Sequence, residues 1–421
     1  MKLLAAAVFV LLAVAAGCGG ENSAKPVAAS SCAKLLYEGN GEPDVIIVSD
    51  FPRRGAAAEF TTLDVEAIKF VLERRDYRAG DLRIGYQSCN DTVGDKPYDS
   101  GVCERNARAY AAAKDVIGVI GPFHSGCAAL QIPIVSRKAA GPLAVISPSN
   151  TDVALTRTVS GGSFSGDELY PDGVRSYLRL VTHDFAQGIA AAHLAKRQGA
   201  RRAVVLHQDE LDPQYVRGLT LPFVASARSL GIHVVQFEWP LRKSYASLAA
   251  SVAEAQPGAV FLAGLTSGNA NRLIEGLRTA LGPGVTLIVP DSFSGPDIGK
   301  ELGAAGQGLL VTNPGFPPEE LPVAGQRFLR ELAPWSTNPL YAAESAQATE
   351  VLLDAIARSD GTRASVVDEL FRTKVTNGIL GSFSFDRYGD IAPAPVGIFR
   401  VEGGNLVPED VIRAPLEEFR G

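Results

Sequence analysis

The chain has 421 residues, enough for two or three folded units at about 150 residues each. Apolar residues make up 46% of it and charged residues 20%, a composition that excludes a disordered or fibrous protein. Lys and Arg number 40 against 46 Asp and Glu, which gives a formal net charge of -6. A mildly acidic chain without a basic stripe is not expected to bind nucleic acid.

The first residues are typical of an export signal. Lys2 supplies a positive charge, and the apolar run 3–14 that follows is too short to span a bilayer of about 30 Å as a helix. Small residues then lead to Cys18 in a pattern that resembles a bacterial lipobox, although Ala15 stands where a Leu is usual. We expect a signal peptide at 1–17 and a lipidated, flexible tether at 18–43. Ordinary secretion with a spare cysteine is the alternative.

Four further cysteines remain, namely Cys32, Cys89, Cys103 and Cys127. An even number suits disulfides in an oxidising compartment, and four buried free thiols are the alternative. Four cysteines allow three pairings, among which the sequence does not choose. No C-x-x-C spacing occurs, so we expect no zinc site.

Expected strands alternate with expected helices through the body of the chain. The run 44–50 is rich in β-branched residues, and the helix after it carries Val65, Ile68 and Val71 on one face. The first series continues with strands at 82–87, 116–121 and 143–147 and helices at 104–115 and 128–139. After a Gly-rich interruption at 159–173, a second series has strands beginning at 176, 203, 233, 259 and 286 and helices at 187–199, 219–230, 245–255 and 270–281. Repeated strand–helix units with apolar strands predict parallel sheets that are covered on both faces.

Polar residues follow several of these strands, where open α/β sheets bind their ligands. Ser125 follows one strand, and Ser149 and Thr151 follow another. Their hydroxyl and backbone N–H groups suit an anion such as a carboxylate, with helix N-capping as the alternative. Asp184 and Asp291 follow two more strands and suit an ammonium group, with helix capping or solvation as the alternative.

The segments 116–134 and 141–156 resemble the extracytoplasmic substrate-binding proteins of branched-chain amino-acid ABC transporters. These are type I periplasmic binding proteins, many of them leucine/isoleucine/valine-binding-like lipoproteins. Further landmarks follow in the family's order, at 179–188, 203–219, 259–264, 287–291, 308–315 and 381–390. The resemblance extends from about Asp44 to the C-terminus.

The resemblance implies an α/β fold of two Rossmann-like lobes, with parallel sheets flanked by helices, joined by a three-stranded hinge. The chain should cross between the lobes near Val181, near 311–314 and near Ser382. The first lobe is then 44–181 plus 313–381, and the second is 182–312 plus 382–421.

An amino acid between the lobes is the ligand that the resemblance implies. Ser125, the backbone of Ser149, and Thr151 would bind its α-carboxylate. Asp184 would bind its α-ammonium group together with Asp291, which stands where leucine binders usually carry Glu.

The resemblance further implies a side-chain pocket for the ligand. Tyr215 would close over the ligand from the second lobe. The expected pocket wall combines Phe123, Leu265, Phe293, Tyr341 and Glu344. If Glu344 faces the ligand, we expect a polar, cationic or amide-like ligand in place of leucine. In the alternative, Glu344 points away from the site and is held by an Arg or by water. Family members often bridge the regions of two of the cysteines, which favours Cys103–Cys127 and leaves Cys32–Cys89.

The function implied is that of an extracytoplasmic lipoprotein, anchored to the membrane by its lipid, that passes a small molecule to an ABC permease. We expect no cofactor and no metal. The sequence contains no G-x-S-x-G, H-E-x-x-H or Walker A motif and no G-x-G-x-x-G after a strand, so no catalytic residue is assigned. A receptor-like ligand sensor and a lipid-anchored hydrolase are the alternatives.

Overall fold

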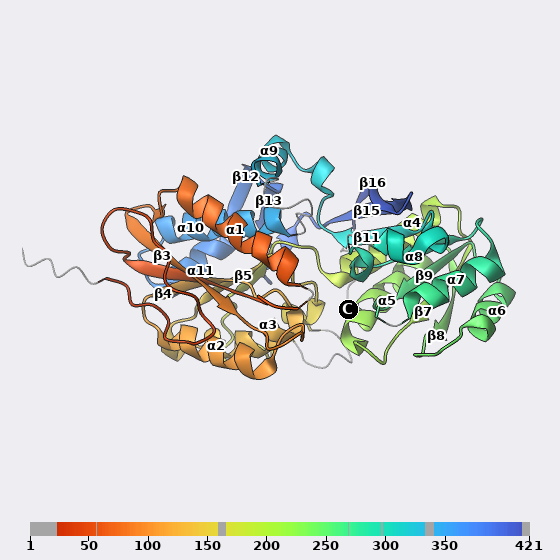
Figure 1. Ribbon diagram of the computed structural model, residues 1–421, viewed down its shortest axis with the longest axis horizontal. Coiled ribbons are helices and arrows are strands. Elements are labelled where there is room, and N and C mark those ends of the chain that lie inside the picture. Colours follow the sequence, from red (N-terminus) through yellow and green to blue (C-terminus); the bar gives the residue numbers. More distant parts are fainter. Residues whose placement is uncertain are drawn as a thin grey trace, which may run out of the picture.

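The strand runs of the sequence form two separate sheets in two lobes, which lie side by side in Figure 1. This computed structural model describes residues 23–55, 57–158, 166–267, 269–295, 298–332 and 341–414. The expected signal peptide at 1–17 and Cys18 lie outside these residues. None of the helices within the described ranges is both long and apolar enough to cross a membrane.

The first lobe contains a sheet with the strand order β2-β3-β1-β4-β5-β6. Its strand pairs are parallel except β2 with β3, which are antiparallel. The strands are β1 (Val45–Phe51), β2 (Arg78–Ala79), β3 (Leu82–Asn90), β4 (Val116–Ile120), β5 (Ala144–Ser147) and β6 (Tyr177–Arg179). The helices of this lobe are α1 (Ala58–Arg74), α2 (Ser100–Ala112), α3 (Ser125–Val135), α9 (Val323–Leu332), α10 (Ala342–Arg358) and α11 (Arg363–Phe371), with 3-10 turns η1 (Lys138–Ala140), η2 (Val153–Leu155) and η4 (Pro318–Glu320).

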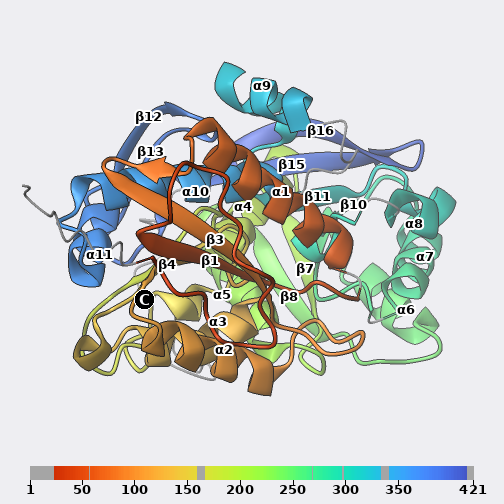
Figure 2. The same ribbon diagram turned by 60° about the vertical axis from the view of Figure 1, so that its left-hand side comes forward.

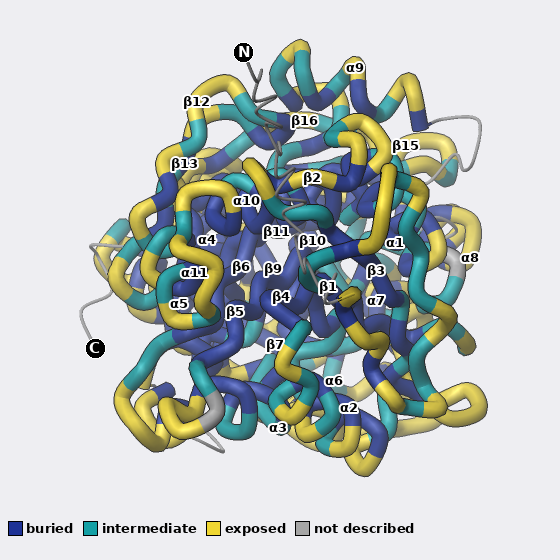
Figure 3. Tube along the Cα trace, turned by 90° about the vertical axis from the view of Figure 1, so that its left-hand side faces the viewer, coloured by how far each residue is buried: buried dark blue, intermediate teal, exposed yellow. Residues whose placement is uncertain are grey.

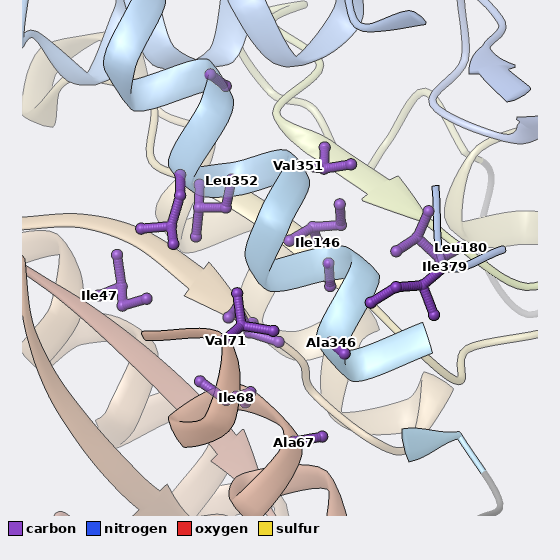
Figure 4. Packing of buried hydrophobic residues seen from close by; sticks show 14 of the residues in the cluster. Ile47, Ala67, Ile68, Val71, Ile146, Leu180, Ala346, Val351, Leu352 and Ile379 are labelled. Atoms are coloured by element: carbon purple, nitrogen blue, oxygen red, sulfur yellow. The ribbon is translucent and has the colours of Figure 1, made fainter. Parts of the chain in front are cut away.

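Both faces of this sheet are buried, because neighbouring residues of a strand point to opposite sides. Ile47 packs in one cluster with Ile68 of α1 and Leu352 of α10 (Figure 4). Ile46 and Val48 belong to a second cluster that includes residues of α2 and α3. Burial on both faces explains why the strands are continuously apolar in sequence. The strands of the core are accordingly dark in Figure 3, while the outer loops are exposed.

The second lobe repeats this plan in a sheet with the order β16-β15-β11-β10-β9-β7-β8. The strands are β7 (Arg202–His207), β8 (His233–Glu238), β9 (Ala259–Ala263), β10 (Thr286–Val289), β11 (Leu310–Pro314), β15 (Pro395–Glu402) and β16 (Asn405–Arg413). The helices are α4 (Asp184–Arg197), α5 (Pro213–Ser229), α6 (Ala246–Glu254), α7 (Ala270–Leu281) and α8 (Ile298–Gly306), with the 3-10 turn η3 (Asp291–Phe293). Helices α4 and α5 cover one face, and α6, α7 and α8 cover the other. The antiparallel strands β15 and β16 lie along one edge (Figure 2). The fold is therefore α/β, with mainly parallel sheets flanked by helices.

The chain passes between the two sheets three times. It leaves the first sheet after Arg179 and enters α4 at Asp184. It leaves the second sheet after Pro314 and continues to α9 and α10 of the first lobe. The third passage lies between Ala392 and Pro395, where β15 begins.

The position of the third passage differs from the expected one near Ser382. Strands β12 (Lys374–Gly378), β13 (Gly381–Phe385) and β14 (Ile391–Ala392) form a small sheet of their own. Phe383, Phe385 and Ile391 from this sheet are buried in the core of the first lobe. Burial of these apolar side chains keeps the segment in the first lobe for about ten residues longer than predicted.

All three passages meet at the carbonyl oxygen of Pro395. This oxygen accepts hydrogen bonds from the Thr182 hydroxyl at 2.6 Å and from the N–H of Gly315 at 3.0 Å. Gly315 has a φ angle of 110°, a backbone conformation that residues other than glycine rarely adopt. The three connecting segments are therefore held together where the lobes join.

Residues 23–43 pack against the first lobe, so the predicted flexible tether is wrong for this stretch. Val27 is only 5% exposed, and its N–H donates to Oε1 of Gln87 at 2.6 Å. Leu36 and Tyr86 exchange two backbone hydrogen bonds, of 2.8 and 2.9 Å. The segment thereby pairs with backbone groups on the outer edge of β3, which a bare edge strand would leave unpaired.

Two disulfides lie in the first lobe, Cys32–Cys89 and Cys103–Cys127. They are the two pairs that the resemblance favours. The first attaches the N-terminal segment to β3, and the second joins α2 to α3.

Removal of the Cys103–Cys127 bridge by a double Cys→Ser substitution should lower the free energy of unfolding by about 2–4 kcal/mol, because the bridge restricts the unfolded chain. Urea unfolding of the oxidised proteins measures this difference. The wild type and the variant should differ much less after full reduction. Peptide mapping without reductant that finds Cys89 joined to Cys103 would contradict the pairing.

Candidate functional site

Two loops of the first lobe meet at the carboxyl ends of β4 and β5. The Ser149 hydroxyl and the Asn150 side-chain amide both donate to the carbonyl oxygen of Phe123, each at 2.8 Å. The N–H of Asp152 donates to the Ser125 hydroxyl at 3.3 Å. The loops are thus bonded to each other, and the predicted residues Ser125 and Ser149 lie at their junction.

A buried arginine holds the loop that follows β5. Arg179, at the end of β6, is fully buried. Its Nη1 donates to the carbonyl oxygens of Asn150 at 3.1 Å and Asp152 at 2.8 Å, and its Nε donates to Oδ1 of Asp390 at 2.8 Å. The Tyr177 hydroxyl donates to the Asn150 side chain at 2.9 Å. These bonds determine the path of the loop that carries Ser149 and Thr151.

Asp390 is the counter-charge of Arg179. It also accepts hydrogen bonds from the Thr156 hydroxyl at 2.9 Å and from Nε of Arg157 at 2.8 Å. Burial alone would raise the pKa of Asp390, but the charges of Arg179 and Arg157 outweigh it and hold this pKa below its usual range. Asp390 is therefore ionised at neutral pH.

The second lobe contributes two carboxyl groups and a tyrosine. The Tyr215 hydroxyl donates to Oδ1 of Asp291 at 2.6 Å. Nε2 of Gln187 donates to Asp291 at 3.0 Å and to Asp184 at 3.3 Å, while its Oε1 accepts from the Thr312 hydroxyl at 3.1 Å. These partners fix the orientation of the amide, because only its nitrogen can donate to carboxylates. Gln187 therefore positions both predicted ammonium ligands.

The two carboxyl groups repel each other. Burial, followed by the charges of Asp291 and Asp152, raises the pKa of Asp184 well above its usual range. Burial also raises the pKa of Asp291, against the opposing effect of the hydrogen bonds from Tyr215 and Gln187. A cation placed between the two acids would relieve this repulsion and lower both pKa values.

The groups from the two lobes touch. The N–H of Asp184 donates to the carbonyl oxygen of Thr151 at 2.9 Å, and the Thr151 hydroxyl lies close enough to Asp184 to lower its pKa. Nε2 of Gln214, on α5, donates to Oδ2 of Asp152 at 2.6 Å. The hydroxyl-bearing loops and the acid pair are thus parts of one site, which we call the interlobe site.

The expected aromatic wall is present only in part. The ring planes of Phe123 and Tyr341 make an angle of 75°, with centroids 5.7 Å apart, and both residues are partly exposed. Leu265 is also partly exposed, and its N–H donates to the side chain of Gln208 at 3.0 Å. Phe293, in contrast, is fully buried in the core of the second lobe, because packing there removes its ring from water. Its expected place in the wall is wrong.

Glu344 lies in the first turn of α10 and is 8% exposed. Burial raises its pKa to about 7. A Cβ atom on Gly315 would lie 3.3 Å from Oε1 of Glu344, so this carboxyl group sits beside the second passage between the lobes. Among the described residues no basic side chain is in salt-bridge distance of it, which argues against the alternative in which an Arg holds it away from the site.

One group of three potential metal ligands occurs within the described ranges. It consists of Asp91, Cys103 and Cys127. Both sulfur atoms belong to a disulfide and are not available as thiolate ligands.

Sequence reasoning missed three residues that organise the interlobe site. Gln187 follows Asp184 at the i+3 position of a helix, a spacing that brings side chains together and gave a usable signal. Arg179 and Asp390 lie 211 residues apart, and no local pattern connects them.

Replacement of Glu344 by Gln should stabilise the protein at alkaline pH. The folded pKa is raised, so ionisation of Glu344 opposes folding increasingly as the pH rises from about 4.5 through about 7. We expect Glu344→Gln to raise the free energy of unfolding by up to about 3 kcal/mol at pH 8.5 and by little at pH 5. Urea unfolding at both pH values measures this.

The control for this measurement is Glu254→Gln, at an exposed position of α6. It should change stability by the same small amount at both pH values. An equal effect of Glu344→Gln at pH 5 and pH 8.5 would contradict the buried, uncompensated carboxyl group.

Comparisons with known proteins agree with this architecture. A family model described as periplasmic binding protein matches residues 53–405. A search of curated proteins found no match. Solved structures of similar fold include a leucine binding protein from Thermotoga maritima, 22% identical over 89% of this chain and 99% of that one, with a TM-score of 0.71.

Two other solved structures of similar fold differ in their bound ligand. An ABC transporter substrate-binding protein from Desulfitobacterium hafniense, in complex with Leu, is 21% identical over 87% of this chain and 99% of that one, with a TM-score of 0.69. An ABC transporter solute binding protein from R. palustris, in complex with 4-hydroxybenzoate, is 15% identical over 88% of this chain and 97% of that one, with a TM-score of 0.70. The family match covers most of the chain, and the chain therefore belongs to the periplasmic binding protein family.

Proposed function

We propose that the protein is an extracytoplasmic solute-binding protein that holds an amino acid, or a similar small polar ligand, between its lobes and delivers it to an ABC permease. Its family consists of binding proteins. Proteins of similar fold are named for binding leucine, and others were solved with aromatic acids. The choice among these ligand classes has to come from the chemistry of the interlobe site.

The observation that carries the proposal is the contact between the acid pair of the second lobe and the hydroxyl-bearing loop of the first. Burial raises the pKa of both Asp184 and Asp291, and the charge of Asp291 adds to the rise at Asp184, so an α-ammonium group between the two acids would favour their ionised forms. The α-carboxylate of the same ligand would then lie toward Ser125 and Thr151, since Thr151 is already in contact with Asp184. A zwitterion matches this pairing of acid groups and donors.

The existing hydrogen bonds show which groups of Ser125, Ser149 and Tyr215 are available to a ligand. The Ser125 oxygen accepts from the N–H of Asp152 at 3.3 Å, which leaves its hydroxyl hydrogen available to a ligand. The Ser149 hydroxyl is committed to the carbonyl oxygen of Phe123, so only the backbone of Ser149 is available. Its N–H makes a long bond of 3.3 Å to Ser147. Tyr215 is committed to Asp291 and would cover the ligand with its ring.

Substitution of Asp184 should weaken amino-acid binding. A charge-assisted hydrogen bond contributes about 1.5–3 kcal/mol, so Asp184→Ala should raise Kd by roughly ten- to a hundredfold. Ser125→Ala should have a smaller effect, because backbone donors remain. Calorimetry against the common amino acids measures both, with Glu254→Gln as a control that leaves Kd unchanged. Neither heat nor a thermal shift with any amino acid would exclude an amino-acid ligand.

We also propose that lipid on Cys18 anchors the protein to the membrane. The support is the apolar run that ends in small residues before this cysteine. Cells supplied with a radioactive fatty acid should label the wild type and should leave Cys18→Ser unlabelled. Equal labelling of the two proteins, or of neither, would exclude the anchor.

A further inference from the structure

The first lobe carries two buried acids that the α-ammonium and α-carboxylate contacts do not use. One of them is Glu344, in the first turn of α10 and three residues after Tyr341. Asp64, in α1, is fully buried, and no hydrogen bond of ordinary length reaches either of its carboxyl oxygens from the described residues. Unpaired acids in such positions cost stability, which points to a ligand as the missing partner.

These two acids lie next to each other and next to the interlobe site. The Ser345 hydroxyl and the charge of Glu344 are close enough to Asp64 to change its pKa. Burial, followed by the charges of acids from both lobes, raises the pKa of Tyr341 well above its usual range. Glu344 also lies against the second passage between the lobes, where a Cβ atom on Gly315 would be 3.3 Å from its Oε1. The Tyr341 ring in turn contacts Phe123 at the edge of the site. Glu344 is thus connected with the interlobe site through Tyr341 and Phe123, whose carbonyl oxygen accepts from the Ser149 hydroxyl.

The charge of the site is strongly one-sided. Arg179 is committed to Asp390, and burial lowers the pKa of His183 to about 4, so that side chain is neutral at physiological pH. Arg53 is the basic group whose charge reaches Asp64, but it makes no salt bridge to it, and its Nη1 donates to the carbonyl oxygen of Thr61 at 3.0 Å. A zwitterion with an apolar side chain would leave Glu344 without a partner. An anionic ligand would add to the repulsion.

We propose that Glu344, supported from behind by Asp64, binds a cationic group at the far end of the ligand, so that the protein takes a basic amino acid with a side-chain ammonium or guanidinium group. This inference rests on the proposed amino-acid site and adds its specificity. Glu344 contacts the cation. Asp64 is a positioning residue: it places a second buried carboxyl group beside Glu344, and burial raises the pKa of Asp64 well above its usual range.

Binding of a basic amino acid should release protons. Burial raises the pKa of Glu344 to about 7, so the group is largely protonated at pH 6.5, and a cation in contact with it favours the ionised form. Calorimetry at pH 6.5 in two buffers of different ionisation enthalpy should show proton release with lysine or arginine that exceeds any release with leucine. Glu344→Gln should remove this excess.

The direct test is calorimetry with arginine, lysine, glutamine and leucine against the wild type, Glu344→Gln, Asp64→Asn and Asp184→Asn. We expect the wild type to bind arginine or lysine at least tenfold more tightly than leucine. Glu344→Gln should reduce this preference at least tenfold while the affinity for leucine is kept or improved. Asp64→Asn should reduce it less. Asp184→Asn should weaken all four ligands by a similar factor.

A matched control lies on the same helix. Glu350 is also partly buried in α10, but Gln347 donates to it at 3.1 Å, and Glu350→Gln should leave the ligand preference unchanged. A wild type that prefers leucine, with no change in Glu344→Gln, would overturn the basic-ligand inference and leave the amino-acid site intact. Binding of none of the four ligands, with a loss of the proton release as well, would overturn both.

Discussion

The buried ion pair between Arg179 and Asp390 sets the geometry on which the interlobe site depends. Removal of two such charges from water costs several kcal/mol per ion, and the attraction between them repays this only when every remaining donor is satisfied. Four of the five N–H groups of Arg179 donate to described residues, namely to Asp390, the Thr156 hydroxyl and the carbonyl oxygens of Asn150 and Asp152. The loop after β5, which carries Ser149 and Thr151, is therefore held by this ion pair. The same pair brings the end of β6 to β14, beside the first and third passages between the lobes.

The interlobe site uses charge in the opposite way. Asp390 has two guanidinium groups beside it, whereas Asp184, Asp291 and Glu344 have no cationic partner among the described side chains, and burial raises the pKa of each. Asp390 is held ionised by its partners, whereas burial favours the neutral form of the three acids proposed to bind the ligand. This contrast separates an acid that maintains the fold from the proposed ligand-binding acids, although both kinds are deeply buried. Gln187 donates to both Asp184 and Asp291 without neutralising either, because an amide carries no net charge.

Local sequence patterns predicted most of the elements and few of their connections. The helix expected at 270–281 has those limits as α7, because its apolar face and its start were both visible in the sequence. The polar residues after β4 and β5 were also visible, since strand ends are where such sheets place their sites. The packing of 23–43 along β3 was not, because it depends on backbone pairing between residues such as Leu36 and Tyr86, 50 positions apart. The third passage was misplaced for a similar reason: an alternating run such as 381–385 does not show which of two cores it enters.

The location of Glu344 connects ligand charge with the joint between the lobes. Its Oε1 lies against Gly315, whose N–H donates to the carbonyl oxygen of Pro395, the point at which all three passages meet. Ionisation of Glu344 without a partner would place a negative charge against the second passage, where burial already disfavours it. With the proposed basic ligand, a cation on Glu344 would favour the ionised carboxyl group at the same place. The charge of such a ligand would therefore act beside the segments that join the lobes.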